Sequence, residues 1–178
     1  MNRGYRYRGR VRSVPDPVVV MGVSGSGKTT VGKALAAALG VRFADADDLH
    51  PVSNVEKMAA GIPLTDVDRW PWLDAVGATL AAGPAVVACS ALRRAYRDRL
   101  RTAAPTLRLV HLHGSRDVLS ERMRDREHFM PVTLLDSQLA TLEVPDADEN
   151  ALSYDVGLSV REIIADAARR LGDGGGST

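Results

Sequence analysis

The stretch Gly22-Val-Ser-Gly-Ser-Gly-Lys-Thr29 decides the fold of this chain. It matches the pattern G-x-x-x-x-G-K-[S/T] at every fixed position. An apolar run, residues 17–22, leads into it, and the segment after it has apolar residues at the helical spacing of Val31, Leu35 and Leu39. A strand, a glycine-rich turn and a helix in this order are typical of a phosphate-binding loop. The sequence therefore predicts a P-loop nucleotide-binding domain.

Each part of the loop has a role in holding phosphates. The glycines allow backbone N–H groups to turn inward, and the helix N-terminus adds partial positive charge. Lys28 is expected to reach the β- and γ-phosphates, and the Thr29 hydroxyl is expected to ligate Mg²⁺. The chain has no N-K-x-D motif, which argues against a GTPase. The expected nucleotide cradle comprises Gly22, Ser24, Gly25, Ser26, Gly27, Lys28, Thr29 and Thr30.

Length and composition favour one soluble domain. The chain has 178 residues, of which 45% are hydrophobic, and its apolar runs are too short to cross a bilayer. Cys89 is the only cysteine and the start lacks a secretory signal, so we expect a reducing, cytoplasmic setting. We expect a disordered basic extension over 1–16, a single domain over 17–171 and a flexible tail over 172–178.

The positive charge is concentrated at the N-terminus, where five arginines precede residue 13. Without residues 1–16 the chain keeps 18 basic and 21 acidic residues, a net charge of −3. This mildly acidic body argues against a nucleic-acid-binding protein. Two interpretations of the arginines stay open: contact with phosphates or an acidic surface, or a disordered extension or misassigned start.

Strands and helices alternate through the rest of the chain, which predicts a parallel α/β sheet flanked by helices. Further strands are expected at 41–44, 83–90, 107–113 and 154–159. Helices are expected at 51–61, 70–82, 93–104, 115–126 and 160–171, with a mixed, polar segment over 127–150.

A group of acidic residues follows the second predicted strand. In an extended chain Asp45 and Asp47 would share a face, and the carboxyl ends of parallel strands meet at the ligand crevice. We expect Asp45 to be a partner of Mg²⁺ and Asp47 to accept the proton of a hydroxyl that attacks the γ-phosphoryl group. The alternative is capping of the next helix, a role that suits Asp48 best. Ser90, at the end of the third strand, is expected to face the same crevice.

Four stretches together resemble the gluconokinase family: GVSGSGKTT (22–30), DADDLHPVSNVEKMAAGIPLTDVDRWPWL (45–73), CSALRRAYRDRLR (89–101) and HFMPVTLLDSQLATLE (128–143). The resemblance runs in order from about residue 17 to residue 171. It implies a nucleoside-monophosphate-kinase-like fold with a five-stranded parallel sheet, and ATP-dependent phosphorylation of D-gluconate at its 6-hydroxyl. It also implies a homodimer, a substrate-binding segment over 45–82 and a lid over 120–150.

Gluconate is an anion with many hydroxyl groups, so its site should combine arginine with Asp, His and Ser. Arg69 is expected to hold the carboxylate, because a helix N-terminus is a poor place for a cation that has no ligand. A surface arginine is the alternative. His50 is expected to bind a substrate hydroxyl, with capping of the helix at Pro51 as the alternative. Trp72 is expected to pack in the core.

By resemblance, Arg122 and Arg126 contact the ATP phosphates; a charged, exposed helix is the alternative for both. Lys28, Asp47 and Arg122 are the expected catalytic residues. The sequence departs from the family at Glu127, where a glycine is usual, and at Val144, where a proline is usual.

Two other functions stay open. One is another kinase of the same fold, such as a shikimate kinase, whose third strand usually ends in glycines rather than in Ala88-Cys-Ser-Ala-Leu92. The other is a nucleotide-binding regulatory module, against which the dense block from Asp45 to Arg69 speaks.

Overall fold

The computed structural model describes residues 15–124 and 132–172, which include the phosphate loop and every predicted strand. Most of the expected N-terminal extension, the middle of the expected lid and the C-terminal tail lie outside these ranges.

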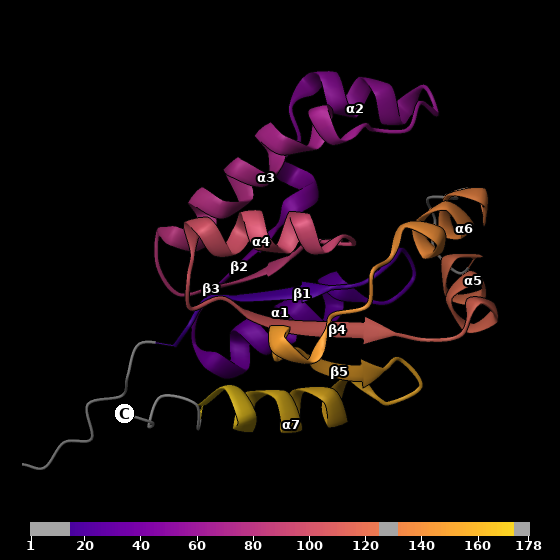
Figure 1. Ribbon diagram of the computed structural model, residues 1–178. Helices are drawn as coiled ribbons and strands as arrows, with labels where there is room; N and C mark the ends of the chain where they lie inside the picture. Colours follow the sequence, from indigo (N-terminus) through magenta and orange to yellow (C-terminus); the bar gives the residue numbers. More distant parts are fainter. Residues whose placement is uncertain (1–14, 125–131, 173–178) are drawn as a thin grey trace, which may run out of the picture.

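A five-stranded parallel sheet forms the centre of the molecule (Figure 1). Its strands are β1 (Val18–Met21), β2 (Arg42–Asp45), β3 (Ala85–Ala88), β4 (Arg108–His113) and β5 (Leu152–Asp155). The order is β2-β3-β1-β4-β5, and every neighbouring pair is parallel. This confirms the predicted fold class. Since β1 lies between β3 and β4, the ligand crevice is expected at its carboxyl end, where the phosphate loop begins.

Helices cover both faces of the sheet. They are α1 (Lys28–Leu39), α2 (Val52–Ala59), α3 (Asp66–Ala81), α4 (Arg94–Ala103), α5 (Arg116–Arg124), α6 (Val132–Thr141) and α7 (Val160–Gly172), with 3₁₀ turns η1 (Ala46–Leu49) and η2 (Ala147–Glu149). α3 and α4 lie on one face and α7 on the other, whereas α2 stands away from the sheet (Figure 1). None of the helices in the described ranges is long and apolar enough to span a membrane.

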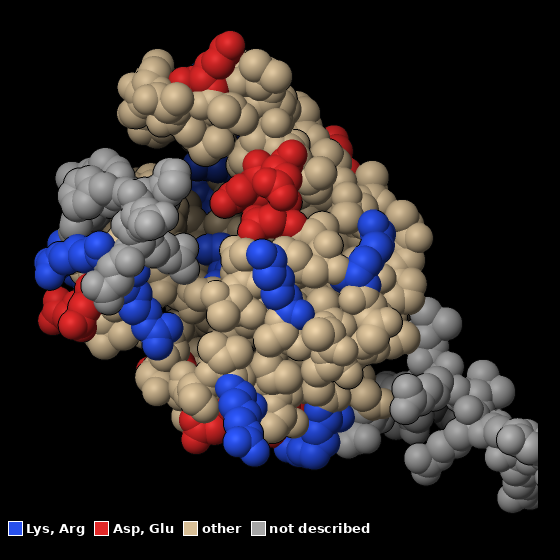
Figure 2. All heavy atoms as spheres, turned by 180° about the vertical axis from the view of Figure 1, so that it is seen from behind, with Lys and Arg blue, Asp and Glu red and all other residues tan. Residues whose placement is uncertain are grey.

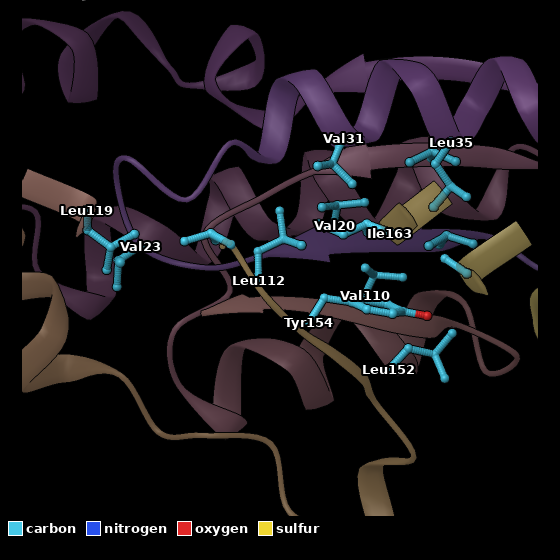
Figure 3. Close-up of a cluster of buried hydrophobic side chains, with 14 of the residues drawn as sticks. Val20, Val23, Val31, Leu35, Val110, Leu112, Leu119, Leu152, Tyr154 and Ile163 are labelled. Atoms are coloured by element: carbon cyan, nitrogen blue, oxygen red, sulfur yellow. The ribbon is translucent and has the colours of Figure 1, made fainter. Parts of the chain in front are cut away.

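Strand β1 is buried on both sides, which explains its uninterrupted apolar sequence. Val18 and Val20 point into a cluster with α1 and α7, part of which is drawn in Figure 3. Val19 and Met21 point into a second cluster formed with α3 and α4. The alternation of side chains along one strand thus divides the core into two halves.

The predicted helix at 70–82 begins earlier than expected. α3 starts at Asp66, because Thr65 and Asp68 form a capping box in which each side chain accepts the other residue's backbone N–H. Pro71 lies inside α3, where it removes the hydrogen bond that an N–H at this position would give to the Val67 carbonyl.

Two other boundaries were wrong. The segment at 127–150, expected to be mixed and polar, contains α6, whose Leu135 is fully buried in the core. The fifth strand covers Leu152–Asp155 rather than 154–159. It ends where the Asp155 carboxylate accepts the Gly157 N–H, which turns the chain.

Candidate active site

The phosphate loop follows a path that only glycine can take at some positions. Gly25 has a φ of 80°, in the left-handed region. A Cβ atom there would lie 2.5 Å from the carbonyl oxygen of Leu119 in α5. The loop is therefore pressed against α5, and a side chain at Gly25 would displace one of the two.

Two polar side chains of the loop lie at its centre. Lys28 Nζ donates to the Val23 carbonyl at 3.1 Å, so the ammonium group folds back over the loop. The Ser26 hydroxyl is buried and has no hydrogen-bond partner within the described residues. Buried hydroxyls are usually paired, so an unpaired one inside a phosphate loop is consistent with a ligand that binds there.

Thr29 joins the loop to the acidic segment after β2. Its hydroxyl donates to Asp45 Oδ2 at 2.8 Å, while Asp45 Oδ1 accepts the Asp47 N–H at 3.2 Å. A hydroxyl and a carboxylate are oxygen ligands of the kind that Mg²⁺ prefers. The described residues contain no group of three or more His, Cys, Asp or Glu able to hold a metal. An ion at this place would therefore take its other ligands from phosphates and water.

Contrary to expectation, Asp47 does not lie in an extended segment. Residues 46–49 form the 3₁₀ turn η1, and Asp45 caps it. The two carboxylates are nevertheless close in space. Burial and the Asp45 charge raise the pKa of Asp47, whereas Lys28 and His50 lower it. The Asp47 side chain is accessible to solvent, yet many protein atoms surround its carboxylate. A side chain at the wall of an open hollow has both properties.

The expected capping role of Asp48 is wrong. The first residue before α2 is Pro51, and no side chain caps that helix. Asp48 is exposed to solvent. The same observation excludes His50 as the cap of α2.

His50 is instead held against Trp72. The two rings stack with centroids 4.3 Å apart, and Trp72 Nε1 donates to the Ala46 carbonyl at 2.7 Å, so Trp72 is buried as expected. Asn54 Nδ2 donates to the Asp68 carbonyl and lies 3.3 Å from His50 Nδ1. Nδ1 is therefore an acceptor and the proton sits on Nε2. Burial lowers the pKa of His50, which favours this neutral form.

Arg69 belongs to a network that the sequence did not indicate. Its Nη1 lies 3.4 Å from the Tyr96 hydroxyl and 3.8 Å from Asp66 Oδ1. The Tyr96 hydroxyl donates to Asp66 Oδ1, and Arg93 Nη1 donates to Asp66 Oδ2 at 3.0 Å. Both guanidinium groups lie within 6 Å of the Tyr96 ring centroid, at 5.7 and 5.9 Å. The spacing of Arg93 and Tyr96, three residues apart at the start of α4, was the available signal.

Ser90 follows β3 and contacts the first residue of the phosphate loop through its backbone, while its expected role in the crevice stays a prediction. Its carbonyl accepts the Gly22 N–H at 3.4 Å. The neighbouring Cys89 is fully buried, and burial raises the pKa of its thiol to about 12, so it is structural.

A pocket of about 460 Å³ lies beside the loop. Arg122 lines it, and its guanidinium donates to the Val156 carbonyl. The sequence did not single out the far wall, which is apolar and formed by the turn after β5 and the start of α7. The lining residues are Gly25, Ser26, Gly27, Thr30, Val31, Arg122, Val156, Leu158, Ser159, Val160 and Ile163. Arg126, the other expected lid arginine, lies outside the described residues.

Seen from behind, the molecule is hollowed beneath the overhanging α2 (Figure 2). Acidic side chains gather in this view below α2, where η1 joins β2 to α2. Basic side chains lie deeper in the hollow. This arrangement suits an acceptor that carries both hydroxyl groups and a negative charge.

The chain is similar to several known kinases. A family model for shikimate kinases matches residues 24–156. A probable gluconokinase of Xenopus tropicalis is 47% identical over 84% of this chain and 90% of its own length. A gluconokinase of Gluconobacter oxydans is 53% identical over 76% and 79%. The crystal structure of a gluconokinase from Sinorhizobium meliloti superposes with a TM-score of 0.84 at 53% identity, covering 90% of this chain and 93% of that chain.

The shikimate kinase structures are more distant. That of Acinetobacter baumannii is 17% identical with a TM-score of 0.59, which shows a shared fold only. The fold, the identity and the coverage agree: the chain is a P-loop kinase and belongs to the gluconokinase family.

Proposed function

We propose that this protein transfers the γ-phosphoryl group of ATP to the 6-hydroxyl of D-gluconate. The observation that carries the proposal is the Thr29–Asp45 hydrogen bond of 2.8 Å. It ties the nucleotide loop to the segment that bears Asp47 and His50. The names of the relatives and the P-loop kinase fold support gluconate as acceptor and ATP as donor.

The reaction needs a base beside the donor phosphate. The 6-hydroxyl oxygen attacks the γ-phosphorus, its proton passes to Asp47, and the bond from phosphorus to the β–γ bridging oxygen breaks. Asp47 suits this role because its raised pKa makes it a better proton acceptor than an ordinary carboxylate, while the charge of Lys28 lowers that pKa and favours the ionised form. The products are 6-phospho-D-gluconate and ADP.

The nucleotide would lie along the loop. The backbone N–H groups at the start of α1 (residues 27–30) and the Lys28 ammonium would bind the phosphates, with Arg122 reaching the charge that develops on transfer. The pocket at Val156–Ile163 supplies an apolar wall for the base of the nucleotide. Thr29 and Asp45 would hold Mg²⁺, which neutralises phosphate charge when bound. For Arg126, contact with the ATP phosphates is proposed from the resemblance alone.

The sugar acid would lie in the hollow under α2. His50 can donate its Nε2–H to a hydroxyl, because Asn54 occupies Nδ1. Arg69 would bind the carboxylate, because its Nη1 faces Tyr96 and Asp66 and a guanidinium group has further N–H donors. The Ser90 hydroxyl, at the edge between the two substrates, would complete the site.

The test is ADP release measured with gluconate, with its epimers, with shikimate and with no acceptor. Gluconate-dependent release is expected. Release with shikimate alone would favour the related kinase. Equal rates of ADP release with and without an acceptor would contradict the proposal that the protein phosphorylates any of these acceptors. That result would favour a nucleotide-binding regulatory module.

We also propose a homodimer in a reducing compartment such as the cytoplasm. The resemblance to gluconokinases supports the dimer, and the single buried thiol of Cys89 supports the compartment. Light scattering after size exclusion, with the mass compared with 19.1 kDa for one chain, tests the dimer.

A further inference from the structure

One hydrogen bond joins the phosphate loop to a helix far away in the sequence. The backbone N–H of Ser24 donates to the side-chain Oε1 of Gln138 in α6 at 2.6 Å, across 114 residues. Ser24 directly precedes Gly25, whose positive φ turns the loop. A side chain from α6 therefore holds the loop where it bends.

The far end of α6 is bound to the acceptor side of the crevice. The N–H of Glu143, just after α6, donates to the Leu92 carbonyl at 2.8 Å, and its carboxylate accepts the Arg94 N–H at 2.6 Å. Leu92 follows Ser90, whose carbonyl accepts the Gly22 N–H. The phosphate loop, α6 and the loop at 90–92 thus form a closed ring of contacts.

The chemistry of the Gln138 side chain fits its place. The amide oxygen accepts the Ser24 N–H, which leaves an NH₂ group with two donors. Within the described part of the chain, this NH₂ group makes no hydrogen bond to protein. A neutral amide can lie near a polyphosphate, whereas a carboxylate of the same length would repel it.

We propose that Gln138 is a positioning residue for phosphoryl transfer. By holding the Ser24 N–H it sets the distance from the phosphate loop to α6. It thereby sets the placement of the donor phosphates relative to the loop at 90–92. Phosphoryl transfer depends chiefly on such positioning, because the protein does little covalent chemistry. This role presupposes the proposed function, because it concerns the coupling of ATP to gluconate.

The hydrogen bond from Ser24 to Gln138 can be tested without an activity assay. Hydrogen exchange of the Ser24 amide, measured by NMR in the nucleotide-free protein, reports how well this bond protects the N–H. Gln138→Met keeps the chain length and removes the acceptor, so exchange should be about tenfold faster. Gln138→Glu keeps an acceptor and should stay within about threefold of wild type. Asp136→Asn is the matched control: it removes the pair between α6 and Arg116, at 2.6 and 2.9 Å, without touching the loop. Equal exchange in wild type and Gln138→Met would overturn the proposal.

Kinetics then separate positioning from packing. In Gln138→Met, kcat with gluconate should fall about tenfold while KM for ATP stays within about twofold. The ratio of ADP release with gluconate to release without it should fall as well. Gln138→Glu keeps the acceptor but places a carboxylate near the phosphates, so it should raise KM for ATP. Asp136→Asn should leave the ratio unchanged. If Asp136→Asn lowers the ratio as much as Gln138→Met does, α6 packing is the cause and the proposal fails. A wild type without gluconate-dependent release would contradict the proposed function, while exchange at Ser24 would still decide whether Gln138 holds the loop.

Discussion

The replacement Glu149→Gln is expected to destabilise the protein far more than any surface change of the same kind. Glu149 in η2 and Arg97 in α4 form an ion pair whose side chains are both 1% exposed. The carboxylate accepts from Arg97 Nε and Nη2, each at 2.7 Å, and from Arg101 at 2.9 Å. The remaining Arg97 nitrogen, Nη1, donates to the carbonyls of Ala91, Leu92 and Glu143.

The magnitude follows from the pKa of Glu149. Burial raises this pKa, but the hydrogen bonds from Arg97 and Arg101 outweigh burial and hold it at about 2, against an ordinary 4.5. A difference of that size corresponds to about 3 kcal/mol in favour of the folded, ionised state. It agrees with the 3–5 kcal/mol typical of removing one partner of a buried pair, because the other charge stays buried and unpaired. We expect Glu149→Gln to lower the free energy of unfolding by about 3 kcal/mol.

Urea unfolding at pH 7, followed by circular dichroism, measures this loss, provided that the slope against urea stays constant. Asp74→Asn is the control. It removes a carboxylate paired with Arg99 in the same two-bond geometry, at 2.7 and 2.9 Å, but both partners are about half exposed. Water already screens that pair, so little change is expected. Equal losses in the two variants would refute the reasoning that burial makes the difference.

The same pair predicts a pH dependence. Because the folded pKa of Glu149 lies below its unfolded value, its contribution is complete above about 4.5 and is lost as the pH falls towards about 2. The difference in stability between wild type and Glu149→Gln should therefore shrink over that window.

The remaining predictions concern the active site. Asp47→Asn should lower kcat by about two orders of magnitude or more, and a near-wild-type rate would reject Asp47 as the base. Since burial and the Asp45 charge raise the pKa of Asp47, kcat/KM for gluconate should rise with pH through an acid limb above the ordinary carboxyl value of 3.8, as a pH–rate profile can measure. Arg69→Ala should raise KM for gluconate, whereas a rise in KM for ATP would place Arg69 in the nucleotide site. Trp72→Phe leaves the Ala46 carbonyl without its donor and should cost about 1–3 kcal/mol in urea unfolding, with a higher KM for gluconate; an unchanged KM would show that the Trp72 N–H does not position His50.

The sequence by itself determined the phosphate loop and the parallel sheet, because both depend on local signals. The loop needs glycines, Lys28 and Thr29 at fixed spacing between a strand and a helix, and residues 17–39 contain all of these. A buried strand such as β1 shows itself as an uninterrupted apolar run. Asp45, Asp47 and His50 stood out because so many polar groups follow one short strand.

Only the tertiary structure decided how these groups meet. The start of α3 is a different case, because Thr65 and Asp68 form a capping box, a local pattern that the spacing of apolar residues does not reveal. Arg93, Tyr96 and Asp66 come together from two helices 27–30 residues apart in sequence. The bond from Ser24 to Gln138 spans 114 residues. Such contacts depend on how helices dock onto the sheet, so no local pattern encodes them.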